Sequence, residues 1–144
     1  MKIKINRIAE GAEIKLPTRA HYNDAGAYVY TTFGETLKPH ETRRIPLGFS
    51  LELPDGVMAC VFPRSGMSLE GLVCELPPID SGYTGEVHAI VTNLTGKLKK
   101  VPGGTRIGQL VVMPIVLADF VEQSGEERGE ERGDGAFGST GEAQ

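Results

Sequence analysis

Every second residue is apolar in the stretch Ile45-Pro46-Leu47-Gly48-Phe49-Ser50-Leu51-Glu52-Leu53. A period of two is typical of a β-strand that buries one face. Pro54-Asp55-Gly56 follows as a turn signal. Residues 57–62 are apolar at both odd and even positions, which indicates a strand buried on both faces. The stretch therefore predicts two consecutive strands joined by a tight turn.

The rest of the chain continues this pattern of short extended segments. Further strands are expected at residues 2–7, 27–32, 86–92, 97–101 and 106–115, with Pro, Gly and Asn in the turns between them. The only helical candidate is residues 65–72, where Ser65 is placed to cap the start and Gly71 to end the helix. Many short strands with one short helix predict an all-β, jelly-roll type of fold.

Composition places the chain among globular proteins. Its 144 residues are 40% hydrophobic and 24% charged, as expected for one domain. No apolar run is long enough to span a membrane, and the first residues lack the apolar core of a secretory signal. The spacing of Cys60 and Cys74 is not that of a metal-binding motif. The net charge of −4 argues against binding to nucleic acid. We expect a cytoplasmic protein with reduced thiols and without membrane or nucleic-acid partners.

Composition changes near the C-terminus. Acidic residues concentrate from Glu122 onward, and a glycine-rich segment follows. We expect a core at residues 1–121, an acidic linker at 122–131 and an active-site lid at 132–144. In the lid, Phe137 offers a flat apolar face, Arg132 offers a forked cation, and the glycines can approach an anion closely. The alternative is a disordered Gly/Ser tail.

Three internal stretches carry side chains suited to a ligand. Pro63-Arg64-Ser65-Gly66 follows a buried strand and offers donors for an anion. Residues 79–86 resemble a hairpin with a polar tip, where Asp80 is a candidate general base. Gln109 lies inside an apolar strand, where an amide needs a partner. Each stretch also has a structural interpretation: a helix cap, an Asp that caps its own turn, or an amide that satisfies the backbone.

Five stretches of the chain lie at residues 24–30, 63–66, 79–86, 104–110 and 132–141. Taken in this order, they resemble the motifs of the trimeric dUTP diphosphatases (dUTPases). The resemblance implies a dUTPase-like distorted jelly-roll, or β-clip, barrel with one short helix and a glycine-rich C-terminal arm. It also implies a homotrimer with active sites shared between subunits, which uses Mg²⁺ to hydrolyse dUTP to dUMP and pyrophosphate.

The resemblance also implies roles for single residues. Asp80 and Gln109 correspond to catalytic positions, with Asp80 orienting the attacking water and Gln109 contacting the phosphate or the water. Tyr83 would pack under the deoxyribose, and the backbone around Ile79 would read the uracil edge. Phe137 would stack on uracil. The phosphate ligands would be Arg64, Ser65, Gly66, Arg132, Gly138, Ser139 and Thr140.

The first motif departs from the family pattern. Tyr28 stands where the motif usually carries an aspartate that is associated with the water shell of the metal. The triphosphate and waters would hold Mg²⁺, so no direct protein ligand is expected, although Asp24 offers a possible carboxylate. A neutral tyrosine cannot replace that charge, which predicts weaker metal dependence or slower turnover.

The sequence shows two further departures from the family pattern and leaves two alternative functions. Leu76-Pro77-Pro78 stiffens the approach to residues 79–86, and Arg128 competes with Arg132 as a phosphate ligand. One alternative function is a non-catalytic regulatory protein of the same fold that binds nucleotide, which Tyr28 favours. The other is the related dCTP deaminase, against which the Phe-Gly-Ser-Thr pattern of the tail argues.

Overall fold

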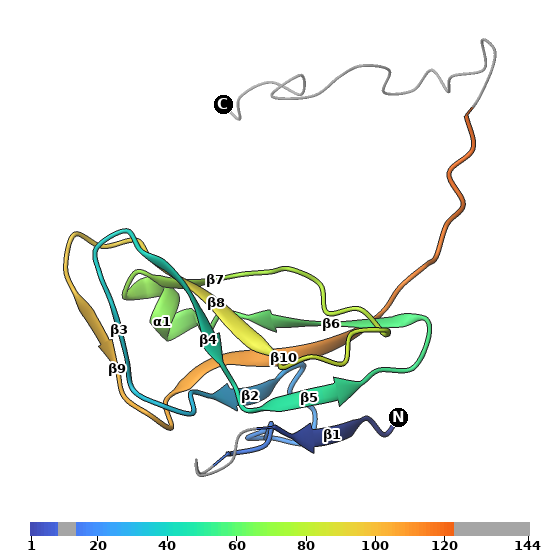
Figure 1. Ribbon diagram of the computed structural model, residues 1–144, viewed down its shortest axis with the longest axis horizontal. Coiled ribbons are helices and arrows are strands. Elements are labelled where there is room, and N and C mark those ends of the chain that lie inside the picture. The colour runs from blue at the N-terminus through green and yellow to red at the C-terminus, as the bar shows by residue number, and fades with distance from the viewer. Residues whose placement is uncertain (9–13, 123–144) are drawn as a thin grey trace.

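The computed structural model describes residues 1–8 and 14–122 (Figure 1). The regular secondary structure of this part of the chain is almost entirely β, with ten strands and one short helix. None of its helices is long and apolar enough to cross a membrane. The elements are β1 (Lys4–Arg7), β2 (Ala27–Tyr30), β3 (Glu35–Leu37), β4 (Thr42–Pro46), β5 (Phe49–Glu52), β6 (Val57–Phe62), α1 (Ser65–Leu69), β7 (Leu72–Glu75), β8 (His88–Asn93), β9 (Lys99–Val101) and β10 (Arg106–Pro114).

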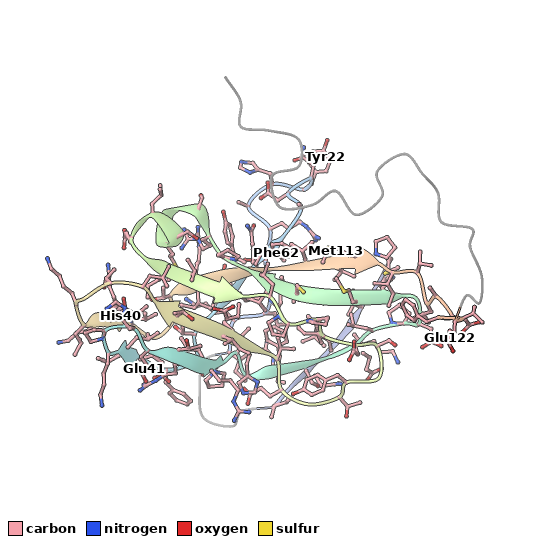
Figure 2. The ribbon with its side chains drawn as sticks, turned by 90° about the horizontal axis from the view of Figure 1, so that it is seen from above. Tyr22, His40, Glu41, Phe62, Met113 and Glu122 are labelled. Atoms are coloured by element: carbon pink, nitrogen blue, oxygen red, sulfur yellow. The ribbon has the colours of Figure 1, made fainter. Side chains whose placement is uncertain are left out.

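The strands form four small antiparallel sheets. Their orders are β2-β10-β6, β4-β8-β7, β1-β5 and β3-β9. In Figure 2, β6 and β10 lie together in one layer and β4 and β5 lie in the layer beneath, with the loop that carries Tyr22 projecting from the body. Neighbouring strands are mostly distant in sequence, as expected for a jelly-roll arrangement.

One apolar core lies between the layers. Phe49, Leu37 and Ile45 are at most 1% exposed, and most strands add further buried apolar side chains to the same cluster. Burying each such large side chain contributes about 1.5–3 kcal/mol to stability. The core therefore fixes the relative positions of the strands that carry the polar residues described below.

The stretch 45–53 does not form the single strand that its alternation predicts. β4 ends at Pro46 and β5 begins at Phe49, so the chain passes from one sheet to another between them. Gly48 makes this possible with a φ of 78°, in the left-handed region that favours glycine. The alternating apolar side chains are nevertheless all buried, so the burial prediction is confirmed while the continuous strand is wrong.

The helix begins differently from the prediction. Arg64, not Ser65, is the N-cap residue, and no side chain caps the helix. Ser65 is the first helical residue, and the helix ends at Leu69 rather than at residue 72. Gly71 follows with a φ of 81°, which confirms its predicted role in ending the helix.

Residues 79–86 are not a regular hairpin. Ile79 forms an isolated antiparallel bridge with Ala59 of β6, and β8 begins only at His88. Tyr83 N–H donates to the Asp80 carbonyl at 3.0 Å, which closes a tight turn. The strands β3 and β7 were not expected from the sequence, because their short segments show little alternation.

Candidate active site

A polar pocket forms beside β10, which is the central strand between β2 and β6. Its lining residues are Tyr28, Arg64, Ser65, Gly66 and Gln109. Gln109 is in the central strand, opposite Tyr28 on one side and Phe62 on the other. Its side-chain amide donates to the Pro63 carbonyl at 3.3 Å, which orients it beside the start of α1. The antiparallel registers thus bring together residues from three of the recognised motifs.

The polar pocket is positively charged. Arg64 lines it, and the guanidinium of Arg106 lies 5.0 Å from the centre of the Tyr28 ring. No carboxylate lines the pocket, and among residues 1–8 and 14–122 neither arginine belongs to an ion pair. A pocket with donors and uncompensated cations attracts phosphate groups. Arg106 was not singled out from the sequence, although it lies within the stretch 104–110.

A second pocket, called the side pocket below, is lined by the site residues that the sequence predicted in the stretch 79–86. Ile79, Asp80 and Tyr83 line it, together with Pro77 and His88 among others. The Tyr83 hydroxyl donates to the Glu86 carbonyl at 2.9 Å, so the ring is held across the turn. This pocket is partly apolar, and its charged lining residues are Arg44, Glu75, Asp80 and Glu86. Of these, the exposed Asp80 is the carboxylate predicted from the sequence. Apolar walls with a few polar groups suit a nucleoside.

Asp80 and Gln109 are not brought together within one chain. The two pockets share no lining residue. In Figure 1 the chain leaves α1 along β7 and runs to the far side of the molecule before the segment that contains Asp80. One chain therefore presents two separate parts of the predicted site.

Asp24 lies outside both pockets. Its carboxylate accepts a hydrogen bond from the His21 N–H at 2.9 Å, which lowers the pKa of Asp24 below its usual value. Within the described part of the chain, no group of three His, Cys, Asp or Glu side chains is placed to hold a metal ion. The cationic polar pocket does not fit a directly coordinated Mg²⁺.

The predicted lid lies outside the described residues. This holds for Arg132, Phe137, Gly138, Ser139 and Thr140, and for the acidic linker beyond Glu122. The chain before them leaves the body after β10 (Figure 1), and its apolar side chains are exposed. These side chains are Val116, Leu117, Phe120 and Val121.

Comparison with known proteins decides the family. The dUTPase family model matches residues 12–141, nearly the whole chain. The chain belongs to the dUTPase family. It is 38% identical to the deoxyuridine 5′-triphosphate nucleotidohydrolase of Clostridium tetani, with 96% of each chain covered. Both findings confirm the resemblance noted in the five motifs.

Solved dUTPase structures confirm the expected fold. The Staphylococcus bacteriophage 80alpha dUTPase with dUPNHPP has a TM-score of 0.88 at 25% identity, covering 97% of this chain and 98% of that one. It is described among phage dUTPases that control transfer of virulence genes by a G protein-like mechanism. A mutant dUTPase from phage phi11 of S. aureus (TM-score 0.79, 22% identity, 89% and 100% covered) is described as coordinating a structural Mg(II) ion.

Proposed function

We propose that this chain hydrolyses dUTP to dUMP and pyrophosphate. The observation that carries the proposal is that a chain of the dUTPase family has two pockets with different linings, one partly apolar with a carboxylate and one polar and cationic. The side pocket suits the deoxyuridine, and the positively charged polar pocket suits the phosphate chain. In the reaction, the oxygen of a water molecule bonds to the α-phosphorus, and the bond from that phosphorus to the oxygen that bridges the α- and β-phosphates breaks. Asp80 takes the proton of the water, and pyrophosphate leaves with the bridging oxygen.

The side pocket supplies the catalytic carboxylate and the selection of the sugar. Asp80 accepts a hydrogen bond from the attacking water and from the 3′-hydroxyl. Tyr83, held by its bond to Glu86, packs under the deoxyribose and leaves no space for a 2′-hydroxyl. The backbone that follows Ile79 reads the edge of uracil. These roles depend on residues that share one pocket in the structure.

The polar pocket holds the phosphates. Arg64 and the Ser65 hydroxyl donate to phosphate oxygens, and the Gly66 backbone approaches them closely. Gln109 donates to a phosphate oxygen or positions the water. Arg132 and the backbone of residues 138–141 add contacts from the lid, with Phe137 stacked on uracil. The main catalytic contributions are positioning and stabilisation of charge.

We further propose a homotrimer in which each active site combines pockets from different subunits. The separation of Asp80 from Gln109 within one chain supports this assembly. A second support is the arm at residues 116–121, whose apolar side chains are exposed. An apolar groove that can receive such an arm from a neighbouring subunit is lined by Met1, Ile3, Ile5, Leu51, Val57 and Val112.

Mg²⁺ bound to the triphosphate would neutralise part of its charge. The described residues supply no direct ligand set for the ion, so we expect phosphate oxygens and water to hold it. The negative net charge and the small-molecule substrate fit a cytoplasmic protein that maintains the nucleotide pool and does not bind nucleic acid.

Pyrophosphate release from a panel of nucleotides tests the proposal. Each nucleotide is assayed with and without Mg²⁺, and we expect release from dUTP in the presence of Mg²⁺ and none from dTTP, UTP or dCTP under either condition. Tight binding of dUTP without release would instead support the regulatory alternative, which Tyr28 favours. Release of ammonia from dCTP would identify a deaminase.

A further inference from the structure

The ring of Tyr28 lies against two guanidinium groups. The Cζ atom of Arg64 is 5.4 Å from the ring centre, and that of Arg106 is 5.0 Å away. Both distances are within the range in which an arginine is attracted by the electron-rich face of an aromatic ring. Tyr28 is only partly buried and lines the polar pocket directly, so both arginines contact a residue of the pocket wall.

The backbone keeps these three side chains together. Arg106 begins β10, and a register shift between Arg106 and Gly108 precedes the pairing of Gln109 with Tyr28. The Arg64 side chain donates from Nη1 to the Arg106 carbonyl at 2.9 Å. This hydrogen bond holds the Arg64 side chain beside the backbone of the residue that carries the second guanidinium. Both guanidiniums carry a positive charge, so an anion that binds to both of them reduces their mutual repulsion.

We propose that Tyr28 is a positioning residue that holds Arg64 and Arg106 as a paired receptor for the phosphate chain, with Arg106 contacting phosphate directly. The proposal rests on the proposed function, because it assigns residues to the phosphate half of that site. A carboxylate at position 28 would pair with the guanidiniums and lower their attraction for phosphate. With the tyrosine, the receptor binds phosphates with less contribution from Mg²⁺.

Binding of inorganic pyrophosphate to the full chain tests this, measured by calorimetry in EDTA and in excess Mg²⁺. Tyr28→Phe keeps the ring and should bind within about twofold of the wild type in EDTA. Tyr28→Leu loses both cation–π contacts and should bind about fivefold to thirtyfold more weakly. Arg106→Gln should weaken binding by about tenfold, since it removes a charge-assisted hydrogen bond.

Tyr28→Asp tests the role of the metal. It should show the largest loss of pyrophosphate affinity in EDTA and the largest recovery on addition of Mg²⁺. Equal Mg²⁺ dependence in the wild type and Tyr28→Asp would overturn the proposal. So would unchanged binding by Tyr28→Leu or Arg106→Gln, or an equal loss in Tyr28→Phe and Tyr28→Leu.

Two controls separate this proposal from other effects. Lys100→Gln removes one positive charge at an exposed residue of β9 and should leave pyrophosphate affinity within about twofold. A loss equal to that of Arg106→Gln would indicate an effect of overall charge and would overturn the proposed contact between Arg106 and phosphate. Should Tyr28→Leu fail to fold, pyrophosphate binding by Arg106→Gln, a substitution at an exposed residue, still tests whether Arg106 contacts phosphate. Because pyrophosphate binding requires no turnover, the receptor is tested even if dUTP hydrolysis is not observed.

Discussion

A side chain on Gly26 would collide with Gln109. A Cβ atom built on Gly26 lies 2.9 Å from both Cβ and Oε1 of Gln109. Real Cβ atoms essentially never approach other atoms so closely, so Gly26 determines where the amide of Gln109 can lie. Gly26, which directly precedes β2, therefore fixes the position of the Gln109 side chain on the adjacent strand β10, and Gln109 lines the polar pocket.

We expect Gly26→Ala to reduce turnover of dUTP by about tenfold, because the displaced amide no longer meets the phosphate or the water. Overpacking should also cost about 1–3 kcal/mol in the free energy of unfolding. Steady-state kinetics and denaturant unfolding measure the two effects. Gly96→Ala is the matched control, because a Cβ at Gly96 meets nothing within 4 Å. Normal turnover in Gly26→Ala would contradict the role of Gln109.

Asp80→Asn should lower kcat by at least about 100-fold, because the amide is a poor acceptor for the proton of the attacking water. The exposed Asp80 side chain makes no hydrogen bond to the described residues, so the melting temperature should hardly change. Asp55→Asn, in the exposed turn before β6, is the control and should leave both quantities unchanged. A kcat close to that of the wild type would remove Asp80 from the catalytic residues.

Tyr83 should control selection against UTP. Tyr83→Ala removes the ring under the sugar, and we expect the ratio of kcat/KM for dUTP to that for UTP to fall by at least about tenfold. Tyr83→Phe keeps the ring and loses only the 2.9 Å bond to the Glu86 carbonyl, so it should retain most of the selectivity. A ratio that is the same in all three proteins would refute the proposed role.

Cys74 should make stability fall at high pH. Burial raises the pKa of its thiol to about 11, with a smaller contribution from the charge of Glu75. An unfolded thiol titrates near 9.0, so the unfolded state loses its proton first and stability declines as pH rises from about 9 to about 11. Denaturant unfolding across this range should show a shallower decline in Cys74→Ala. Parallel curves for the two proteins would show that Cys74 does not contribute.

Removal of the residues after Glu131 tests the lid. The truncated chain should lose most of its pyrophosphate release from dUTP, because it lacks Arg132 and Phe137. Its melting temperature without ligand should stay near that of the full chain, since the buried core of residues 1–8 and 14–122 lies before the removed segment. Within the full chain, Arg132→Gln and Arg128→Gln identify which arginine contacts phosphate. Full activity after truncation would contradict the role of the tail.

The local patterns of the sequence predicted much of the fold. β1, β2, β6, β9 and β10 lie within the expected segments, and the alternating side chains from Ile45 to Leu53 are buried. These predictions succeeded because the side chains of a strand alternate between its two faces, so an alternation of apolar and polar residues indicates the strand from adjacent residues alone. The continuous strand at 45–53 failed because the alternation of side chains continues across a bend at Gly48. Similarly, Ile79 pairs with the distant Ala59 rather than across its own turn.

The sequence by itself determined the family, the all-β class and the residue types of the site, because motifs and alternation are properties of the linear chain. Only the tertiary structure decided which of those residues meet. The register of β10 against β2 and β6 places Gln109 beside Tyr28 and Arg64, and it brings Arg106 to the same ring. The same packing puts Asp80 in a different pocket. Strand pairing over long separations sets these distances, and no local pattern encodes such a register.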